Sequence, residues 1–215
     1  MGALRLVVLF VVALIPVGRA AAQVDGAATR MIIPLVASTP SFTSEITLKD
    51  ESGTSNTVTM QFVEGQTSSS PGVKACGTIP LAAFQVTTVT LGTQCALAGP
   101  GGHFGYVLLT SSASNKWFFA YSRNSTPQGI GFSVEGYPLG HIGGGDSFSE
   151  VAGIKRKAAA GSSPAFQTNC FVATLDDPVD YAIHVDDANG SGTKTGTLAP
   201  FQLERILDIY GAAGA

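Results

Sequence analysis

Charged residues are scarce in this sequence of 215 residues: they make up 13% of it, and the formal net charge is only −3. Without a basic face, the chain offers no electrostatic footprint for nucleic acid or for an anionic membrane surface. Its one basic cluster, Lys155-Arg156-Lys157, is short and is typical of a solvated strand edge, where lysines discourage pairing between sheets. We therefore expect no nucleic-acid partner.

Long hydrophobic runs are also rare. The apolar run Leu6–Ile15 covers about ten residues, whereas a membrane-spanning helix needs roughly twenty. Arg5 precedes the run, and Ala20-Ala21-Ala22 follows it with the small residues that signal peptidase reads. This pattern predicts a secretory signal peptide over residues 1–22 and a secreted protein, extracellular or on the cell surface, without a membrane span after cleavage. An uncleaved anchor is the alternative.

There are only three cysteines. Cys76 and Cys95 flank one hairpin-like segment and are the natural pair for a disulfide in an exported protein. Two buried thiols are the alternative, because spacing alone does not fix disulfide geometry. Cys170 lies in an apolar stretch, which favours a small core residue over a nucleophile. No Cys-x-x-Cys motif or Cys/His cluster suggests zinc, and we expect no cofactor.

What the sequence does contain is a succession of short apolar segments divided by Gly, Pro, Ser and Asn. In the segment 57–62, Val58, Met60 and Phe62 alternate with Thr and Gln, as in a strand with one buried face. The predicted strands of this part are residues 31–37, 43–49, 57–63, 84–91, 105–110, 116–122 and 129–134. Together they predict an all-β fold with an immunoglobulin-like β-sandwich over residues 23–138.

The remainder of the chain starts with glycines. Residues 139–150 have the composition of a flexible linker. The strands predicted after it are residues 151–157, 166–173, 179–186 and 194–198. In the segment 201–210, Leu203, Ile206, Leu207 and Tyr210 recur at helical spacing, which predicts a helix there.

The second set of strands resembles the first. Leu81-Ala82-Ala83-Phe84-Gln85-Val86 matches Leu198-Ala199-Pro200-Phe201-Gln202-Leu203, and Ser41–Ile46 matches Ala165–Cys170. These matches predict a second, incomplete copy of the sandwich over residues 151–215, with chance similarity as the alternative. Because nothing in the second copy matches the strands predicted over residues 105–134, we expect either a fragment of a longer protein, which we favour, or a second half that packs on the first.

Several segments together resemble a known family. They are Ile33-Pro34-Leu35-Val36-Ala37, Phe42 with Ile46-Thr47-Leu48, Tyr121-Ser122-Arg123-Asn124 with Gly129-Ile130-Gly131-Phe132, and Phe166-Gln167-Thr168-Asn169-Cys170-Phe171-Val172. This pattern resembles the tandem immunoglobulin-like repeats of uncharacterised secreted bacterial proteins. The resemblance implies extracellular modules without assigned catalytic residues. The usual Arg-Thr-Asp or Arg-Thr-Asn is replaced here by Thr43-Ser44-Glu45 and Gln167-Thr168-Asn169.

Two motifs suggest chemistry but are incomplete. Gly145-Asp146-Ser147-Phe148-Ser149 resembles the nucleophile block of GDSL-type esterases, but the Asp180–His184 pair has one residue too many for the partner motif. Asp187-Ala188-Asn189-Gly190 resembles the start of a calcium loop, yet Leu198 stands where the bidentate Glu is needed. A hairpin turn explains that segment more simply. The dispersed histidines His103, His141 and His184 are then ordinary surface or edge residues.

The aromatic run Trp117-Phe118-Phe119-Ala120-Tyr121 allows a binding role. Alternate side chains of a strand point into the core, so core packing is the first interpretation. Trp117 and Tyr121 are nevertheless candidate ligand-facing aromatics. The sequence as a whole predicts a non-catalytic extracellular module for surface display, adhesion or service as an accessory to a larger secreted protein, with a cell-surface glycan or protein as partner. A carbohydrate-binding module is the alternative, and a GDSL-like esterase is a distant one.

Overall fold

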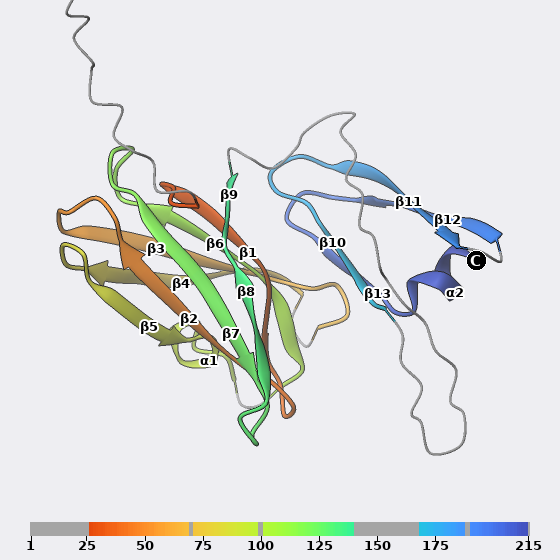
Figure 1. Cartoon of the computed structure of the whole chain (residues 1–215), viewed down its shortest axis with the longest axis horizontal. Helices are drawn as coiled ribbons and strands as arrows, with labels where there is room; N and C mark the ends of the chain where they lie inside the picture. Colours follow the sequence, from red (N-terminus) through yellow and green to blue (C-terminus); the bar gives the residue numbers. More distant parts are fainter. Residues whose placement is uncertain (1–25, 69–70, 99–100, 140–167, 188–189, 215) are drawn as a thin grey trace, which may run out of the picture.

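The computed structural model describes residues 26–68, 71–98, 101–139, 168–187 and 190–214. These residues form antiparallel sheets with two very short helices, so the all-β prediction is confirmed. We call residues 26–139 the first unit and residues 168–214 the second unit (Figure 1). The predicted signal peptide, most of the glycine-rich linker and the strand predicted over residues 151–157 lie outside the described residues.

Strands and one short helix make up most of the described part of the first unit. They are β1 (Arg30–Ser38), β2 (Thr43–Asp50), β3 (Asn56–Glu64), β4 (Gly72–Leu81), β5 (Val86–Thr90), α1 (Leu91–Gln94), β6 (His103–Ser111), β7 (Phe118–Ser125), β8 (Gly131–Glu135) and β9 (Tyr137–Pro138). The second unit contains β10 (Cys170–Ala173), β11 (Val179–Asp187), β12 (Gly190–Leu198), β13 (Leu203–Ile206) and α2 (Ile209–Ala213).

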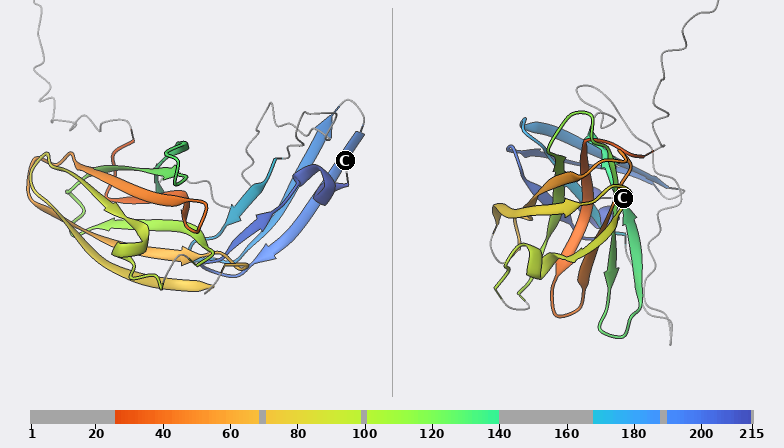
Figure 2. Two further views of the ribbon diagram at one scale, coloured as in Figure 1. Left: turned by 90° about the horizontal axis from the view of Figure 1, so that it is seen from below. Right: turned by 90° about the vertical axis from the view of Figure 1, so that its left-hand side faces the viewer.

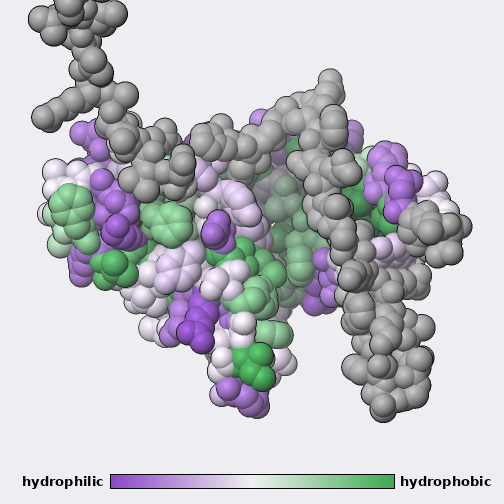
Figure 3. All heavy atoms as spheres, in the orientation of Figure 1, coloured by the Kyte–Doolittle hydropathy of each residue, from purple (hydrophilic) through white to green (hydrophobic). Residues whose placement is uncertain are grey.

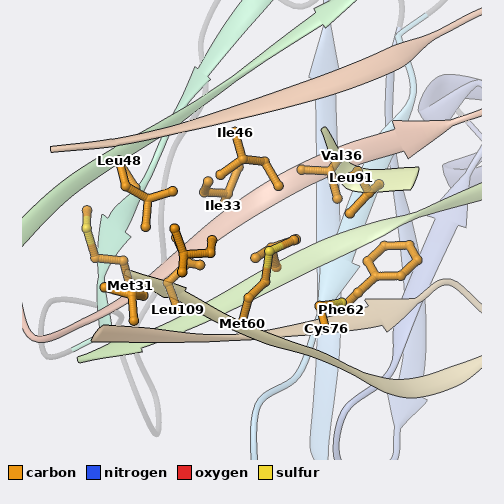
Figure 4. Close-up of a cluster of buried hydrophobic side chains, with 14 of the residues drawn as sticks. Met31, Ile33, Val36, Ile46, Leu48, Met60, Phe62, Cys76, Leu91 and Leu109 are labelled. Carbon is orange, nitrogen blue, oxygen red and sulfur yellow. The ribbon is translucent and has the colours of Figure 1, made fainter. Parts of the chain in front are cut away.

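One 9-stranded sheet makes up the first unit, in the order β4-β3-β6-β1-β2-β7-β8, with β5 on β2 and β9 on β1. It curls over a shared core to which β1, β2, β3 and β6 each send alternate side chains (Figure 4). Val58, Met60 and Phe62 of β3 are all 0% exposed, as their alternation predicted. Burial of such side chains is the main source of stability for a domain of this kind.

Two strand predictions in the first unit are wrong. Strand β4 was not predicted, because Gly77 and Pro80 interrupt its apolar pattern. The strand forms nevertheless, because an edge strand that pairs only with β3 tolerates glycine and proline. Phe84 does not begin a strand. It lies in the turn before β5 with a φ of 57°, in the left-handed region, and β5 starts at Val86.

The helix predicted over residues 201–210 is also wrong, since Leu203–Ile206 is strand β13, paired with β10. In a strand, residues three apart point to opposite faces. Leu203 packs into the core cluster of the first unit, whereas Ile206 packs into a separate cluster of the second unit. A strand with one buried residue on each face, three positions apart, therefore has the same spacing as a helix. Leu207 is 52% exposed, and only the short helix α2 follows.

The second unit packs against the end of the first (Figure 2). The Gln66 N–H donates to the Leu203 carbonyl at 3.0 Å, and the Tyr106 hydroxyl donates to the Thr174 carbonyl at 2.5 Å. Phe104, Tyr106 and Leu203 share one apolar cluster across this junction. Among the described residues the second half therefore packs on the first, which was the less favoured of the two expectations.

Candidate functional site

The strand β7 sorts its aromatic run into two faces. Phe118 and Ala120 are 0% exposed and point into the core, whereas Phe119 and Tyr121 alternate with them and are half-buried. Trp117, which directly precedes the strand, is half-buried as well. The Phe119 and Tyr121 rings lie 6.2 Å apart, tilted by 45°. We call Trp117, Phe119 and Tyr121 the β7 outer face. Core packing, the first interpretation of this run, therefore holds for its alternate members only.

Polar side chains border the β7 outer face. Thr47 lies opposite Tyr121, and Lys49 lies opposite Phe119, on the neighbouring strand β2. One strand further, Thr88 of β5 lies 2.9 Å from Thr47 between hydroxyl oxygens. Half-exposed rings supply flat apolar area, and hydroxyl groups beside them supply donors and acceptors. This arrangement is suited to a ring-shaped polar ligand, and the ligand-facing role of Trp117 and Tyr121 stays a prediction.

A buried polar cluster joins the ends of β3 and β6. His103 Nδ1 lies 2.6 Å from Glu64 Oε1, and the two residues are 5% and 3% exposed. The Ser68 hydroxyl donates to the same Glu64 oxygen at 2.5 Å. The prediction that His103 is an ordinary surface or edge residue is therefore wrong. The pairing of β3 with β6 brings Glu64 and His103 together. The two residues are 39 positions apart, so the contact could not be predicted from the sequence.

The three side chains of this cluster are not arranged as a catalytic triad. In a catalytic triad the histidine stands between the nucleophile and the carboxylate. Here Glu64 stands between Ser68 and His103, so the imidazole does not contact the hydroxyl it would have to activate. Ser68 also donates to the Gly102 carbonyl and accepts from the Phe104 N–H. The cluster is suited to holding the loop after β3 against β6.

The residues proposed for an esterase are not brought together by the described structure. Asp180 accepts a hydrogen bond from Thr197 at 2.6 Å, and His184 Nδ1 lies 2.9 Å from the Thr193 hydroxyl oxygen. Both partners lie directly opposite on β12, so these contacts belong to the β11–β12 hairpin. Ser147 and His141 lie outside the described residues.

Asp187 and Gly190, from the segment that resembles a calcium loop, pair with each other at the end of this hairpin. Ala188 and Asn189 lie outside the described residues. Over the described ranges, no group of three or more His, Cys, Asp or Glu side chains is placed to hold a metal ion.

The cysteines have different environments. Cys76 and Cys95 form a disulfide with an S–S distance of 2.04 Å, and both are buried in the main core. Cys170 is a free, half-buried thiol next to the second unit's apolar cluster. Burial raises the pKa of the Cys170 thiol, which lowers the fraction of reactive thiolate at neutral pH.

Tyr106 should make stability fall at alkaline pH. Burial raises the pKa of its hydroxyl well above the usual value for tyrosine, so the folded state holds this proton more tightly than the unfolded state. The contribution is present below pH 10 and is lost as pH rises toward the folded pKa. Tyr106→Phe should cost about 1 kcal/mol at neutral pH, because the bond to Thr174 is lost, and should flatten the alkaline decline.

Urea unfolding of both proteins at about pH 8 and about pH 11 checks this, because all other titrating groups are common to both. An equal loss of stability between the two pH values in both proteins would contradict the assignment to Tyr106.

No family model, curated protein or solved structure matches this chain. None of the helices in the described ranges has the length and apolarity needed to cross a membrane.

Proposed function

We propose that this chain is a non-catalytic, exported module made of two immunoglobulin-like β-sandwich units of one type, the second incomplete. It serves in surface display, in adhesion or as an accessory to a larger secreted protein. The signal sequence supports export, and the pairing registers of the two units support the repeat. The observation that carries the proposal is the agreement between β2–β5 and β10–β13.

The two strand pairs have the same register. In the first unit Ile46 lies opposite Val89, and in the second unit Cys170 lies opposite Ile206. Each residue pair between β10 and β13 has a counterpart between β2 and β5. The residue numbers differ by 124 between β2 and β10 and by 117 between β5 and β13. These shifts are the ones by which the matched sequence segments differ. A chance likeness of short β segments does not require a common register.

The turns before β5 and β13 also agree. Phe84 and Phe201 have φ values of 57° and 55°, an uncommon conformation for residues with bulky side chains. Two residues before each Phe, a backbone N–H donates to the following glutamine side chain: Ala82 to Gln85 at 2.7 Å and Ala199 to Gln202 at 2.9 Å. The same strained turn with the same side-chain bond favours two copies of one structural unit.

The hairpins extend the correspondence. Leu81 of β4 lies opposite Asn56, and Leu198 of β12, at the shift of 117, lies opposite Val179. Both hairpins precede the turns just described. The correspondence between the two units therefore covers the hairpin, the turn after it and the strand pair that follows.

Export and activity test this proposal. Expressed with its own N-terminus in a bacterial host, the chain should be found outside the cell with Gln23 as its first residue. The purified protein should show no hydrolysis of ester, peptide or glycoside substrates. Hydrolysis that Ser147→Ala abolishes would overturn the proposal in favour of the esterase.

A carbohydrate-binding role is the second candidate, and the β7 outer face favours it. On a glycan array the purified protein should then bind a narrow set of sugars. Tyr121→Ala should weaken that binding at least about tenfold, because a stacking ring is lost. Tyr137→Ala is the matched control, since Tyr137 is 54% exposed but lies on β9, outside this face. A blank array would leave the structural role as the better account.

A further inference from the structure

A groove of about 390 Å³ opens between the two units. The end of β1, the turn after it and β8 form one wall, and β10 with β13 forms the other. Hydrophobic side chains, drawn in green, gather where the units meet (Figure 3). This volume is within the range of small-molecule sites, which commonly lie at domain junctions.

Exposed phenylalanines line both walls of this groove. From the first unit, Phe42 and Phe132 meet edge to face with ring centroids 6.4 Å apart. From the second unit, Phe171 faces them and is 36% exposed. Phe132 is 48% exposed although it lies in a regular strand. Exposed aromatic residues gathered in one concavity are typical of a binding site.

Arg205 contributes a positive charge to this apolar groove. The Arg205 guanidinium carbon lies 4.8 Å from the centre of the Phe104 ring, which fixes the group against the groove wall. Among the described residues Arg205 has no carboxylate within ion-pair distance, whereas Lys49 and Lys194 each have one. Its planar fork of donors is therefore available for an anion.

Asn124 also lines the groove, but it is buried and its amide N–H groups already have partners. They donate to the Leu35 carbonyl at 3.4 Å and to the Ser122 hydroxyl at 3.3 Å, so the anion partner on this wall is Arg205. The ligand that fits such a groove has a flat apolar body for the phenylalanines and one anionic oxygen group for the guanidinium.

We propose that the groove between the two units binds a small aromatic carboxylate, whose carboxylate pairs with Arg205 and whose ring lies between Phe132 and Phe171. The site goes beyond display or adhesion, because it lies at the junction and away from the β7 outer face. Arg205 selects for negative charge, and the phenylalanines select for an apolar ring.

Titration calorimetry with 2-naphthoate tests the proposal on the purified protein. The wild type should bind 2-naphthoate at least about tenfold more tightly than the uncharged 2-naphthamide, since only the acid forms a charge-assisted pair. Arg205→Gln should remove this difference by weakening the acid alone. Phe132→Ala should weaken both compounds, because it removes apolar wall without touching the charge.

Two controls keep these outcomes interpretable. Arg123→Gln removes an exposed arginine of β7 that does not line the groove, and it should leave both affinities unchanged. An unchanged unfolding midpoint shows that the Arg205 and Phe132 variants remain folded. No detectable binding of 2-naphthoate to the wild type, or equal affinity for acid and amide, would overturn the proposal. So would an Arg205→Gln variant that still prefers the acid.

Discussion

Replacing both Cys76 and Cys95 with alanine should lower the free energy of unfolding by about 3 kcal/mol. The disulfide joins residues 19 apart and ties β4 to the segment that follows α1. Without it, the unfolded chain gains the freedom of that closed loop, and this entropy is the main loss in the chain-entropy model. Both sulfurs lie in the main core, so the vacated volume adds to the cost.

Chemical denaturation with and without a reductant separates these two contributions. Reduced wild-type protein keeps both sulfurs and shows the effect of the cross-link alone. Cys170→Ala is the matched control: it removes a half-buried sulfur that closes no loop, and it should retain the full sensitivity to reductant. A wild type whose unfolding midpoint does not respond to reductant would contradict a stabilising role for the disulfide.

The strands that could be predicted are those whose environment differs between their two faces. Val58, Met60 and Phe62 are buried while the Thr and Gln residues between them are exposed, so the pattern is visible in the sequence itself. Strand β13 lacks this asymmetry, because Leu203 and Ile206 are buried on opposite sides. Each face of β13 is buried at one end only, with Glu204 half-exposed and Arg205 exposed between them, so no pattern of period two appears.

The groove and the buried polar cluster could not be predicted, because both depend on contacts between distant segments. Phe132 and Phe171 come from different units and lie on one groove only because Tyr106 and Leu203 fix the junction. The matched turn motifs at Phe84 and Phe201 are different. The match between the two segments is local and therefore visible in the sequence, but their left-handed turns were not predicted, because Phe84 was expected to begin a strand and residues 201–210 a helix.

His103→Leu should lower the free energy of unfolding by about 1–3 kcal/mol, the range for a buried polar group that loses one hydrogen-bond partner. Glu64 is 3% exposed and lies between His103 and Ser68. Loss of the imidazole leaves the buried carboxylate with fewer hydrogen bonds to offset its desolvation. His184→Leu is the matched control, since His184 is exposed on β11 and should change stability by about 0.5 kcal/mol or less.

A double-mutant cycle then distinguishes the loss of the pair from the loss of packing. If the cost of His103→Leu comes from the hydrogen bond that the buried Glu64 side chain loses, replacing Glu64 with leucine as well should recover much of it, because the polar group that lost a partner is then absent. Ser68 keeps a hydrogen bond to the Gly102 carbonyl at 3.0 Å in that variant. A double variant less stable than the sum of the two single losses would show instead that both side chains are required for packing. A single His103→Leu loss below about 1 kcal/mol would show that the pair contributes little to the fold.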